Sequence, residues 1–130
     1  MKKTLIKVCG ITNIDDIKYA SNIEDINYLG IIFAKESPRC VDLNLAEKLI
    51  NACDKKKKIV AVFMNQSKED VNSIIKNLDL DILQFHGHES VDFCNFFKKP
   101  FIKTFHIKNK ELNINMDFIK YAHAFLLDTS

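Results

Sequence analysis

The feature that most constrains the fold of this chain is a regular alternation of short apolar runs with segments of helical period. The runs are rich in β-branched and aromatic residues, as strands are. Six of them recur, at residues 5–10, 28–34, 59–64, 82–86, 101–107 and 124–128. The segments between them have apolar residues at helical spacing, at 14–21, 44–52, 68–78 and 89–97, with a shorter turn of helix at 116–121. Strands this apolar have no solvent-exposed face, which predicts a parallel sheet covered by helices on its faces.

Two architectures fit this alternation: an open doubly wound sheet and a (β/α)₈ barrel. An open doubly wound sheet usually has a glycine-rich, nucleotide-binding turn after its first strand. The turn at residues 9–12 is not glycine-rich in this way. Polar residues that interrupt the strands favour the barrel, because barrel active sites gather at the carboxyl ends of the strands. These residues are Lys7 and Cys9 on the first strand, Gln84 and His86 on the fourth, and Asp128 at the end of the sixth.

Length and charge narrow the range of partners. The 130 residues are enough for one domain with a buried core, and no linker divides them. The net charge is only +2, and the lysine run at 55–58 is typical of a solvated helix end that leads into a strand. No basic stripe is interleaved with aromatic residues, so we expect no nucleic-acid partner.

The cysteines and the amino-terminal segment indicate the compartment. The chain opens on a basic segment with Lys2 and Lys3, but the apolar segment behind it is too short for a signal-peptide core or a membrane span. The four cysteines fall in no paired or metal-like spacing. We therefore expect a reduced, cytoplasmic setting and no membrane partner.

Five short motifs, each at a predicted strand end, occur in order along the whole chain. They are Lys7-Val8-Cys9-Gly10-Ile11-Thr12, Phe33-Ala34-Lys35-Glu36-Ser37-Pro38-Arg39, Val60-Ala61-Val62-Phe63-Met64-Asn65, Leu83-Gln84-Phe85-His86-Gly87 and Leu126-Leu127-Asp128-Thr129. Together they resemble the phosphoribosylanthranilate isomerases of tryptophan biosynthesis. The resemblance implies a (β/α)₈ barrel that carries out an Amadori rearrangement. N-(5′-phosphoribosyl)anthranilate would become 1-(2-carboxyphenylamino)-1-deoxyribulose 5-phosphate.

The resemblance also implies roles for individual residues. Cys9 would be the general base, Asp128 the general acid, and Arg39 would hold the anthranilate end of the substrate. Gln84 and His86 would line the site. Without the motifs, a cysteine at a strand end is usually a small buried hydrophobe, and an aspartate followed by Thr-Ser is equally typical of a helix cap.

The chemistry of this reaction requires two proton-transfer groups on opposite sides of a bound sugar. An acid must protonate the ring oxygen so that the ring opens to an iminium, and a base must then remove the proton from C2′. The iminium is itself the electron sink, so we expect no metal and no organic cofactor. Lys7, two residues before Cys9 on the same strand face, is the candidate cation that would favour the thiolate. Partial burial of Asp128 would favour its protonated form.

Three histidines invite a metal interpretation. His86 and His88 form a His-x-His pair, and His106 lies on the next predicted strand. Barrel hydrolases can begin with such a pair, but no later strand supplies further ligands. We therefore expect no metal, and we expect Cys40, Cys53 and Cys94 to be small core residues.

The chain departs from the family in length. A complete (β/α)₈ barrel needs at least ~200 residues. We therefore expect residues 1–130 to form a single partial-barrel domain of about five βα units plus a sixth strand. The loops after strands seven and eight, which usually bind phosphate in barrels, would be missing.

An incomplete barrel would have two open sheet edges. We expect such a chain to be poorly stable, to self-associate or to be completed by a second chain. Two alternatives to a working isomerase follow: a catalytically incomplete remnant or half-barrel that associates through its edges, and another phosphosugar-binding barrel enzyme.

Overall fold

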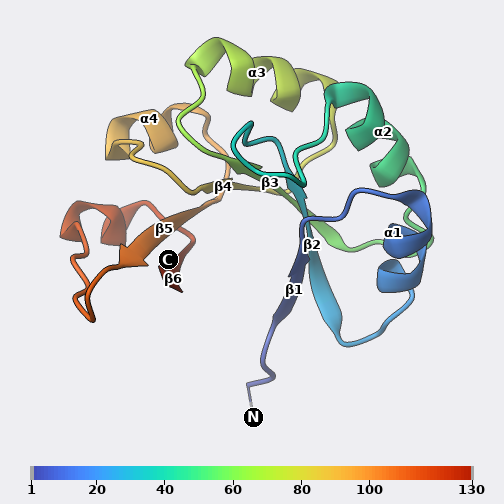
Figure 1. The fold of residues 1–130 in the computed structure, drawn as a ribbon, viewed down its shortest axis with the longest axis horizontal. Helices are drawn as coiled ribbons and strands as arrows, with labels where there is room; N and C mark the ends of the chain where they lie inside the picture. The colour runs from blue at the N-terminus through green and yellow to red at the C-terminus, as the bar shows by residue number, and fades with distance from the viewer. Residues whose placement is uncertain (1, 130) are drawn as a thin grey trace.

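The computed structural model describes residues 2–129. Met1 and Ser130 lie outside the described residues, and the predictions of a basic amino-terminal segment and of a helix cap each extended to one of them. Its strands form one all-parallel sheet in the order β1-β2-β3-β4-β5-β6 (Figure 1). The strands are β1 Ile6–Cys9, β2 Ile26–Ile32, β3 Lys58–Phe63, β4 Ile82–Phe85, β5 Phe101–Ile107 and β6 Ala124–Thr129. The helices are α1 Ile14–Ser21, α2 Leu43–Asn51, α3 Lys68–Asn77 and α4 Val91–Phe96, with a 3₁₀ helix, η1, at Met116–Lys120.

The predicted alternation of strands and helices is confirmed. The largest boundary differences are two residues: β2 begins and ends two residues before the predicted 28–34 run, and α4 begins two residues after the predicted start at 89. The sheet is parallel, as the unbroken apolar character of its strands predicts. Within residues 2–129, no helix has both the length and the apolar character needed to cross a membrane.

The four α-helices all begin at a polar side chain that caps the first turn. In each, the capping oxygen accepts a hydrogen bond from a backbone N–H three residues later, which satisfies a donor that has no partner within the helix. The capping residues are Asn13, Asp42, Ser67 and Ser90. These caps fix the residue at which each helix begins.

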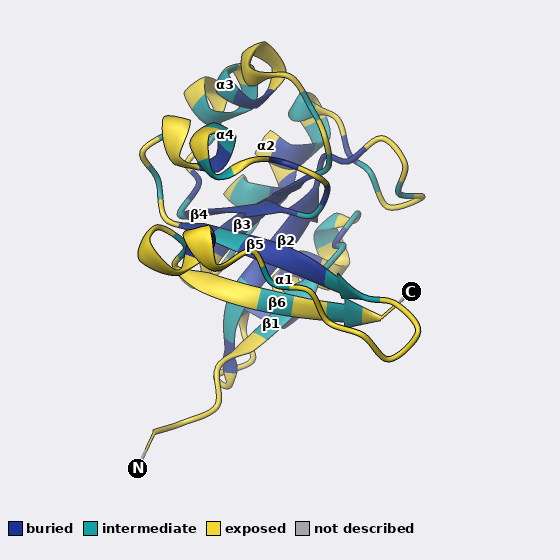
Figure 2. Ribbon diagram, turned by 90° about the vertical axis from the view of Figure 1, so that its left-hand side faces the viewer, coloured by how far each residue is buried: buried dark blue, intermediate teal, exposed yellow. Residues whose placement is uncertain are grey.

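The main core lies between the sheet and the helices that cover its outer face (Figure 2). Phenylalanines from successive strands form its centre: the Phe33 and Phe63 rings stack at 5.7 Å, and the Phe63 and Phe85 rings at 5.9 Å. Phe118 of η1 closes the layer against Phe105, with ring centroids 5.8 Å apart. Figure 2 shows the inner strands as buried and β6 as largely exposed.

The sheet is strongly curved, with its concave face turned away from the helices. Lys7 on β1 donates a hydrogen bond through Nζ to Oε1 of Gln84 on β4. In a flat sheet these strands would be three spacings, or about 14 Å, apart. The contact requires the barrel-like curvature seen in Figure 1.

Candidate active site

The concave face of the sheet holds most of the polar side chains of the strands, whereas the opposite positions are mostly apolar and face the helices; Lys103, whose ammonium lies over the Phe118 ring, is an exception. This alternation follows from the two-residue period of a strand. A cavity of about 540 Å³ opens on this face at the carboxyl ends of the strands. All six side chains singled out from the sequence line it: Lys7, Cys9, Arg39, Gln84, His86 and Asp128.

Cys9 is positioned by a neighbouring glycine and a small apolar cluster. It pairs with Gly30 across β1 and β2, where a Cβ would lie 2.6 Å from the Cys9 Sγ. The missing side chain leaves the space that the thiol occupies. Cys9 also packs against Ile32 and Val62, which form a second, smaller core on the concave face.

Gly10 shapes the turn that follows Cys9. Its φ of 87° lies in the left-handed region, which disfavours other residues. A Cβ here would also lie 2.6 Å from Cζ of Arg39, so the guanidinium lies across the glycine. Nη1 of Arg39 donates to the carbonyl oxygen of Cys9 at 3.1 Å. The Arg39 side chain is otherwise exposed, so its remaining donors face the mouth of the cavity.

Lys7 and Gln84 form a polar pair beneath Cys9. Burial lowers the pKa of the Lys7 ammonium, and the charge of nearby Cys9 acts in the opposite direction. Gln84 is 3% exposed and accepts the Lys7 hydrogen bond. An interior lysine is costly without a polar partner, and here the partner is an amide.

His86, His106 and Asp128 meet at the opposite side of the cavity. Nε2 of His86 lies 3.4 Å from Oδ2 of Asp128, and Nδ1 of His106 lies 3.8 Å from the same oxygen. The two imidazole rings are perpendicular, with centroids 4.9 Å apart. Burial lowers the pKa of His86, and the neighbouring His106 lowers it further, although the Asp128 charge raises it. The lowered pKa favours the neutral imidazole of His86.

Asp128 lies within β6, directly opposite His106 of β5 in the parallel register. The alternative interpretation of Asp128 as a helix cap is therefore wrong. Its side chain is partly buried, with 42% of its surface exposed. His88, which forms a His-x-His pair with His86 in the sequence, is exposed and lies outside this group. The third member of the group is Asp128 and not His88.

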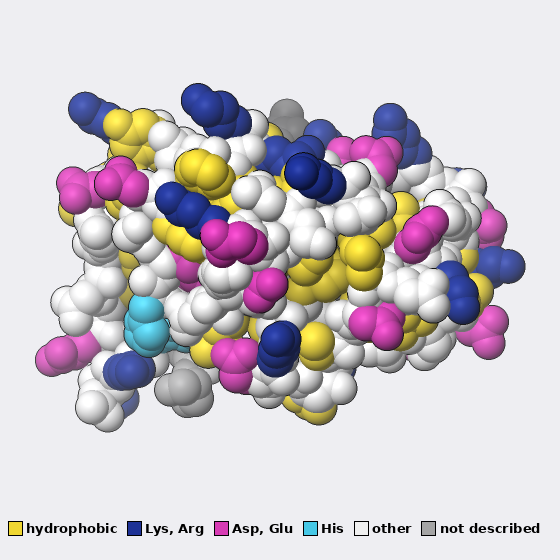
Figure 3. Space-filling model, turned by 90° about the horizontal axis from the view of Figure 1, so that it is seen from above, with side chains coloured by type: hydrophobic (Ala, Val, Ile, Leu, Met, Phe, Trp, Pro, Cys, Tyr) yellow, Lys and Arg dark blue, Asp and Glu magenta, His cyan; other side chains and the backbone are white. Residues whose placement is uncertain are grey.

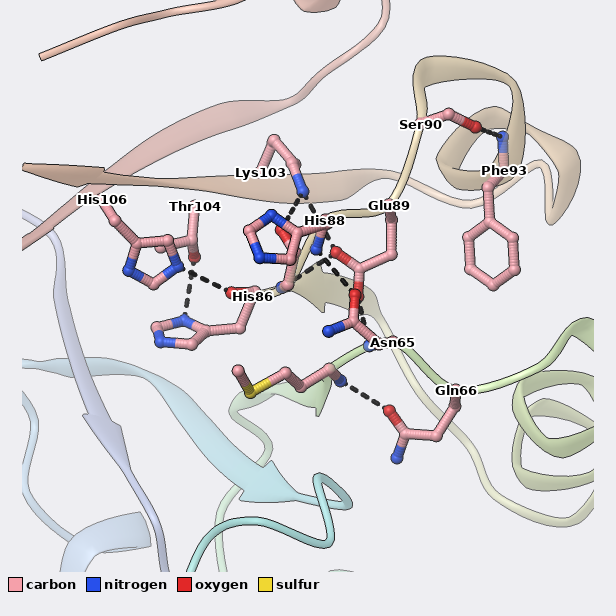
Figure 4. A network of polar contacts seen from close by, with 12 residues as sticks. Asn65, Gln66, His86, His88, Glu89, Ser90, Phe93, Lys103, Thr104 and His106 are labelled. Carbon is pink, nitrogen blue, oxygen red and sulfur yellow. Dashed lines mark hydrogen bonds and ion pairs between the residues drawn. The ribbon is translucent and has the colours of Figure 1, made fainter.

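A buried ion pair holds the loop that follows β4 (Figure 4). Nζ of Lys103 lies 3.1 Å from Oε1 of Glu89 and donates to the carbonyl oxygen of Gly87 at 2.8 Å. The second Glu89 oxygen accepts from the backbone N–H of Asn65 at 2.8 Å, and Asn65 Oδ1 accepts from the backbone N–H of His88 at 2.7 Å. The loops after β3 and β4 are thereby fixed to each other and to β5.

The sequence predictions do not include this network. The signal was there in Lys103, a lysine in the middle of an apolar run that had to be paired if the run was a buried strand. The sequence predicts Glu89 only as the first residue of a helical segment, and Asn65 only as the last residue of a motif at a strand end. The prediction that the other cysteines are small core residues is confirmed for Cys94, which is fully buried, whereas Cys40 and Cys53 are only half-buried.

The comparisons with known proteins agree on one family. The family model described as N-(5′-phosphoribosyl)anthranilate (PRA) isomerase matches residues 6–130. An N-(5′-phosphoribosyl)anthranilate isomerase of Legionella pneumophila is 40% identical over 125 residues, which are 95% of this chain and 60% of that relative. The chain thus spans about three fifths of the length of the curated relatives it matches.

Solved structures of the same family share the fold. The crystal structure of phosphoribosyl anthranilate isomerase from Thermus thermophilus superposes with a TM-score of 0.80 at 26% identity, covering 98% of this chain and 62% of that one. A second structure holds the reduced form of 1-(o-carboxyphenylamino)-1-deoxyribulose 5-phosphate. It superposes with a TM-score of 0.78 at 24% identity, covering 97% of this chain and 64% of its own. These superpositions confirm the (β/α)₈ barrel family as the fold class.

Proposed function

This chain belongs to the N-(5′-phosphoribosyl)anthranilate isomerase family, and we propose that it serves that family's reaction, the Amadori rearrangement in tryptophan biosynthesis. The observation that carries the proposal is the convergence of Cys9, Arg39 and Asp128 on one cavity at the carboxyl ends of the strands. These residues come from β1, from the loop after β2 and from β6, so only the folded sheet brings them together. The substrate class is a phosphosugar joined to an anthranilate.

In the proposed mechanism, Asp128 acts first. Its carboxyl group donates a proton to the ribose ring oxygen, the C1′–O bond breaks, and the nitrogen lone pair forms an iminium at C1′. The thiolate of Cys9 then removes the proton from C2′, and the electron pair of that C–H bond moves to give the enolamine. Tautomerisation of the enolamine gives the ketone. No group outside the substrate accepts electrons, so no cofactor takes part.

The positions of the two groups support this division of work. Cys9 is on β1 and Asp128 on β6, the two outermost strands of the described sheet, and both line the same cavity. Curvature of the sheet therefore turns the two groups toward a substrate held between them. Lys7 lies close enough for its charge to interact with Cys9, and we propose that it favours the thiolate.

We propose that Arg39 binds the anthranilate carboxylate. Its guanidinium is anchored by one hydrogen bond to the Cys9 carbonyl oxygen, and its other donors can form a planar fork toward a carboxylate. Gln84 and His86 line the floor of the cavity. The product analogue bound in the related crystal structure carries the same carboxyphenyl group.

We also infer the setting in which the protein works. All four cysteines are free, which suits a reduced cytoplasm. Positive and negative side chains are interspersed on the face seen in Figure 3, and the net charge is +2, which favours a small-molecule substrate over a nucleic acid. Residues 1–130 form one domain in this proposal, supported by a single sheet and a continuous core.

A chimera tests the proposal. Residues 6–129 of this chain would replace the matching segment of the Legionella pneumophila relative, and conversion of N-(5′-phosphoribosyl)anthranilate would be followed by the change in substrate fluorescence. The proposal predicts turnover. A folded chimera that binds the reduced product analogue but does not convert the substrate contradicts it. Activity on ribose phosphates that lack the anthranilate would favour a different phosphosugar isomerase.

A further inference from the structure

The group formed by His86, His106 and Asp128 has a second chemical capacity that proton transfer does not use. One ligand atom from each residue lies within 4.8 Å of the other two, and the three residues come from the adjacent strands β4, β5 and β6. Two imidazoles and one carboxylate are a ligand set that suits first-row divalent metals.

The hydrogen bonds of His106 fix its tautomer. Its Nε2 lies 2.9 Å from the carbonyl oxygen of His86. A carbonyl oxygen can only accept, so Nε2 carries the hydrogen, and in the neutral ring Nδ1 has the lone pair. That lone pair faces Oδ2 of Asp128 at 3.8 Å. Two electron-rich atoms thus face each other, an arrangement that a cation between them would stabilise.

His86 presents the same arrangement from the other side. Its Nδ1 lies 3.1 Å from Oγ1 of Thr104, which is buried and can accept that N–H (Figure 4). Nε2 then has its lone pair directed at Oδ2 of Asp128, 3.4 Å away. Metal-binding histidines usually donate their other ring nitrogen to a neighbouring oxygen, which fixes the ring and its tautomer. Both histidines here already have such a partner.

Two of the three separations between ligand atoms are close to those around a tetrahedral ion, and the third, between the two histidines, is within 4.8 Å. Two ligand atoms that each lie about 2.1 Å from zinc at the tetrahedral angle are about 3.4 Å apart. The His86–Asp128 pair has this separation, and the His106–Asp128 pair exceeds it by a few tenths of an ångström. The side chains are 26–42% exposed, so small rotations are open to them and an ion can enter from the cavity.

We propose that His86, His106 and Asp128 form a binding site for a divalent transition metal ion such as Zn²⁺, with the fourth position open to the cavity. Nε2 of His86, Nδ1 of His106 and Oδ2 of Asp128 are the ligands. The backbone N–H of His86 donates to the carbonyl oxygen of Phe63 at 2.8 Å, and its carbonyl oxygen accepts from His106 Nε2 at 2.9 Å, so the site is largely formed before the ion arrives.

The ion would compete with the reaction rather than assist it. A metal bound to Asp128 occupies the carboxylate that is proposed to give its proton to the ring oxygen. Zn²⁺ should therefore inhibit turnover, a consequence that rests on the proposed function. Metal binding itself does not rest on it, so the two can fail separately.

Calorimetric titration of the 130-residue chain with Zn²⁺ tests the site. We expect about one equivalent to bind, with affinity at least tenfold weaker in His106→Gln and in Asp128→Asn. His88→Gln is the matched control, because His88 is exposed, lies two residues from His86 and is outside the group. It should bind as the unmodified chain does. No binding, or equal weakening in His88→Gln, overturns the site.

A second measurement needs no variant and so does not depend on how a variant folds. With Co²⁺ in place of Zn²⁺, the site predicts weak d–d absorption of a nitrogen and oxygen ligand set, and paramagnetic shifts of the His86 and His106 ring protons. An intense thiolate-to-cobalt band would assign the ion to a cysteine instead and would contradict the proposal. Unshifted His86 and His106 resonances would contradict it as well.

Discussion

At the scale of single residues, Cys9 depends on the absence of a side chain across the sheet. A Cβ on Gly30 would lie 2.6 Å from the Cys9 Sγ and 3.1 Å from its Cα. Gly30→Ala must therefore move the thiol, and we expect turnover of the chimera to fall at least tenfold, because misplacement by about 1 Å can cost that much or more. Steady-state kinetics measure the turnover, and urea denaturation of the same samples measures the stability.

Ile31→Val is the control for that substitution. Ile31 is on the same strand, fully buried in the core on the other face of the sheet. It should cost about 0.5–1.5 kcal/mol of stability and leave kcat unchanged. If Gly30→Ala keeps kcat within twofold of the parent, the space at Gly30 does not position the thiol.

Cys94 should resist alkylation in the folded chain. Burial raises the pKa of its thiol from 9.0 to about 12. Because the folded pKa lies above the unfolded one, its contribution to stability is complete below pH 9 and is lost as the pH rises toward 12. At pH 8.5 we expect iodoacetamide, followed by mass spectrometry, to label half-buried Cys40 and to spare Cys94 until denaturant is added. Equal labelling of both in the native chain would contradict this.

At the scale of elements, the loop after β4 depends on the buried pair of Lys103 and Glu89, whose side chains are 5% and 3% exposed. Lys103→Met would leave a buried carboxylate without its partner, and we expect a loss of about 3–5 kcal/mol in the free energy of unfolding by urea. Adding Glu89→Gln should recover part of the loss, because the remaining group is neutral and can still accept hydrogen bonds. Lys76→Met on the exposed face of α3 should change stability by less than about 0.5 kcal/mol. A loss in Lys103→Met no larger than this would rule out the pair as a support of the loop.

The elements themselves could be predicted because their signals are local. Apolar runs, helical spacing and capping side chains such as Asn13 are read from neighbouring residues, and the strand and helix assignments follow from them. The beginning of β2 was missed because Asn27 interrupts its apolar pattern, and Asn27 instead accepts the Ile6 N–H through its side chain.

Contacts between strands could not be predicted because they depend on register and curvature. Nothing near Gly30 in the sequence indicates that it faces Cys9, and nothing near Lys103 indicates Glu89. The placement of Cys9 and Asp128 at strand ends could be predicted from motif positions. The approach of His106 to Asp128 required the β5–β6 register.

At the scale of the whole molecule, the described sheet has two outer strands that each pair on one side only, β1 and β6. Leu127 on β6 is 53% exposed and Ile6 on β1 is 42% exposed. We expect a polypeptide of residues 1–130 to associate through these strands, with a mass by light scattering above its 15.0 kDa. Leu127→Lys should reduce the association. A cooperatively unfolding species of 15.0 kDa at every concentration would contradict this prediction.

The central claim is that the concave face holds an acid and a base on opposite sides of one cavity. The most direct test is kcat of the chimera with Cys9→Ser, with Asp128→Asn and with the control Cys40→Ser, each checked for binding of the reduced product analogue. We predict that the first two retain binding and lose about 10²–10⁴-fold in kcat, while Cys40→Ser turns over as the parent does. Turnover within threefold of the parent in either Cys9→Ser or Asp128→Asn would contradict the account.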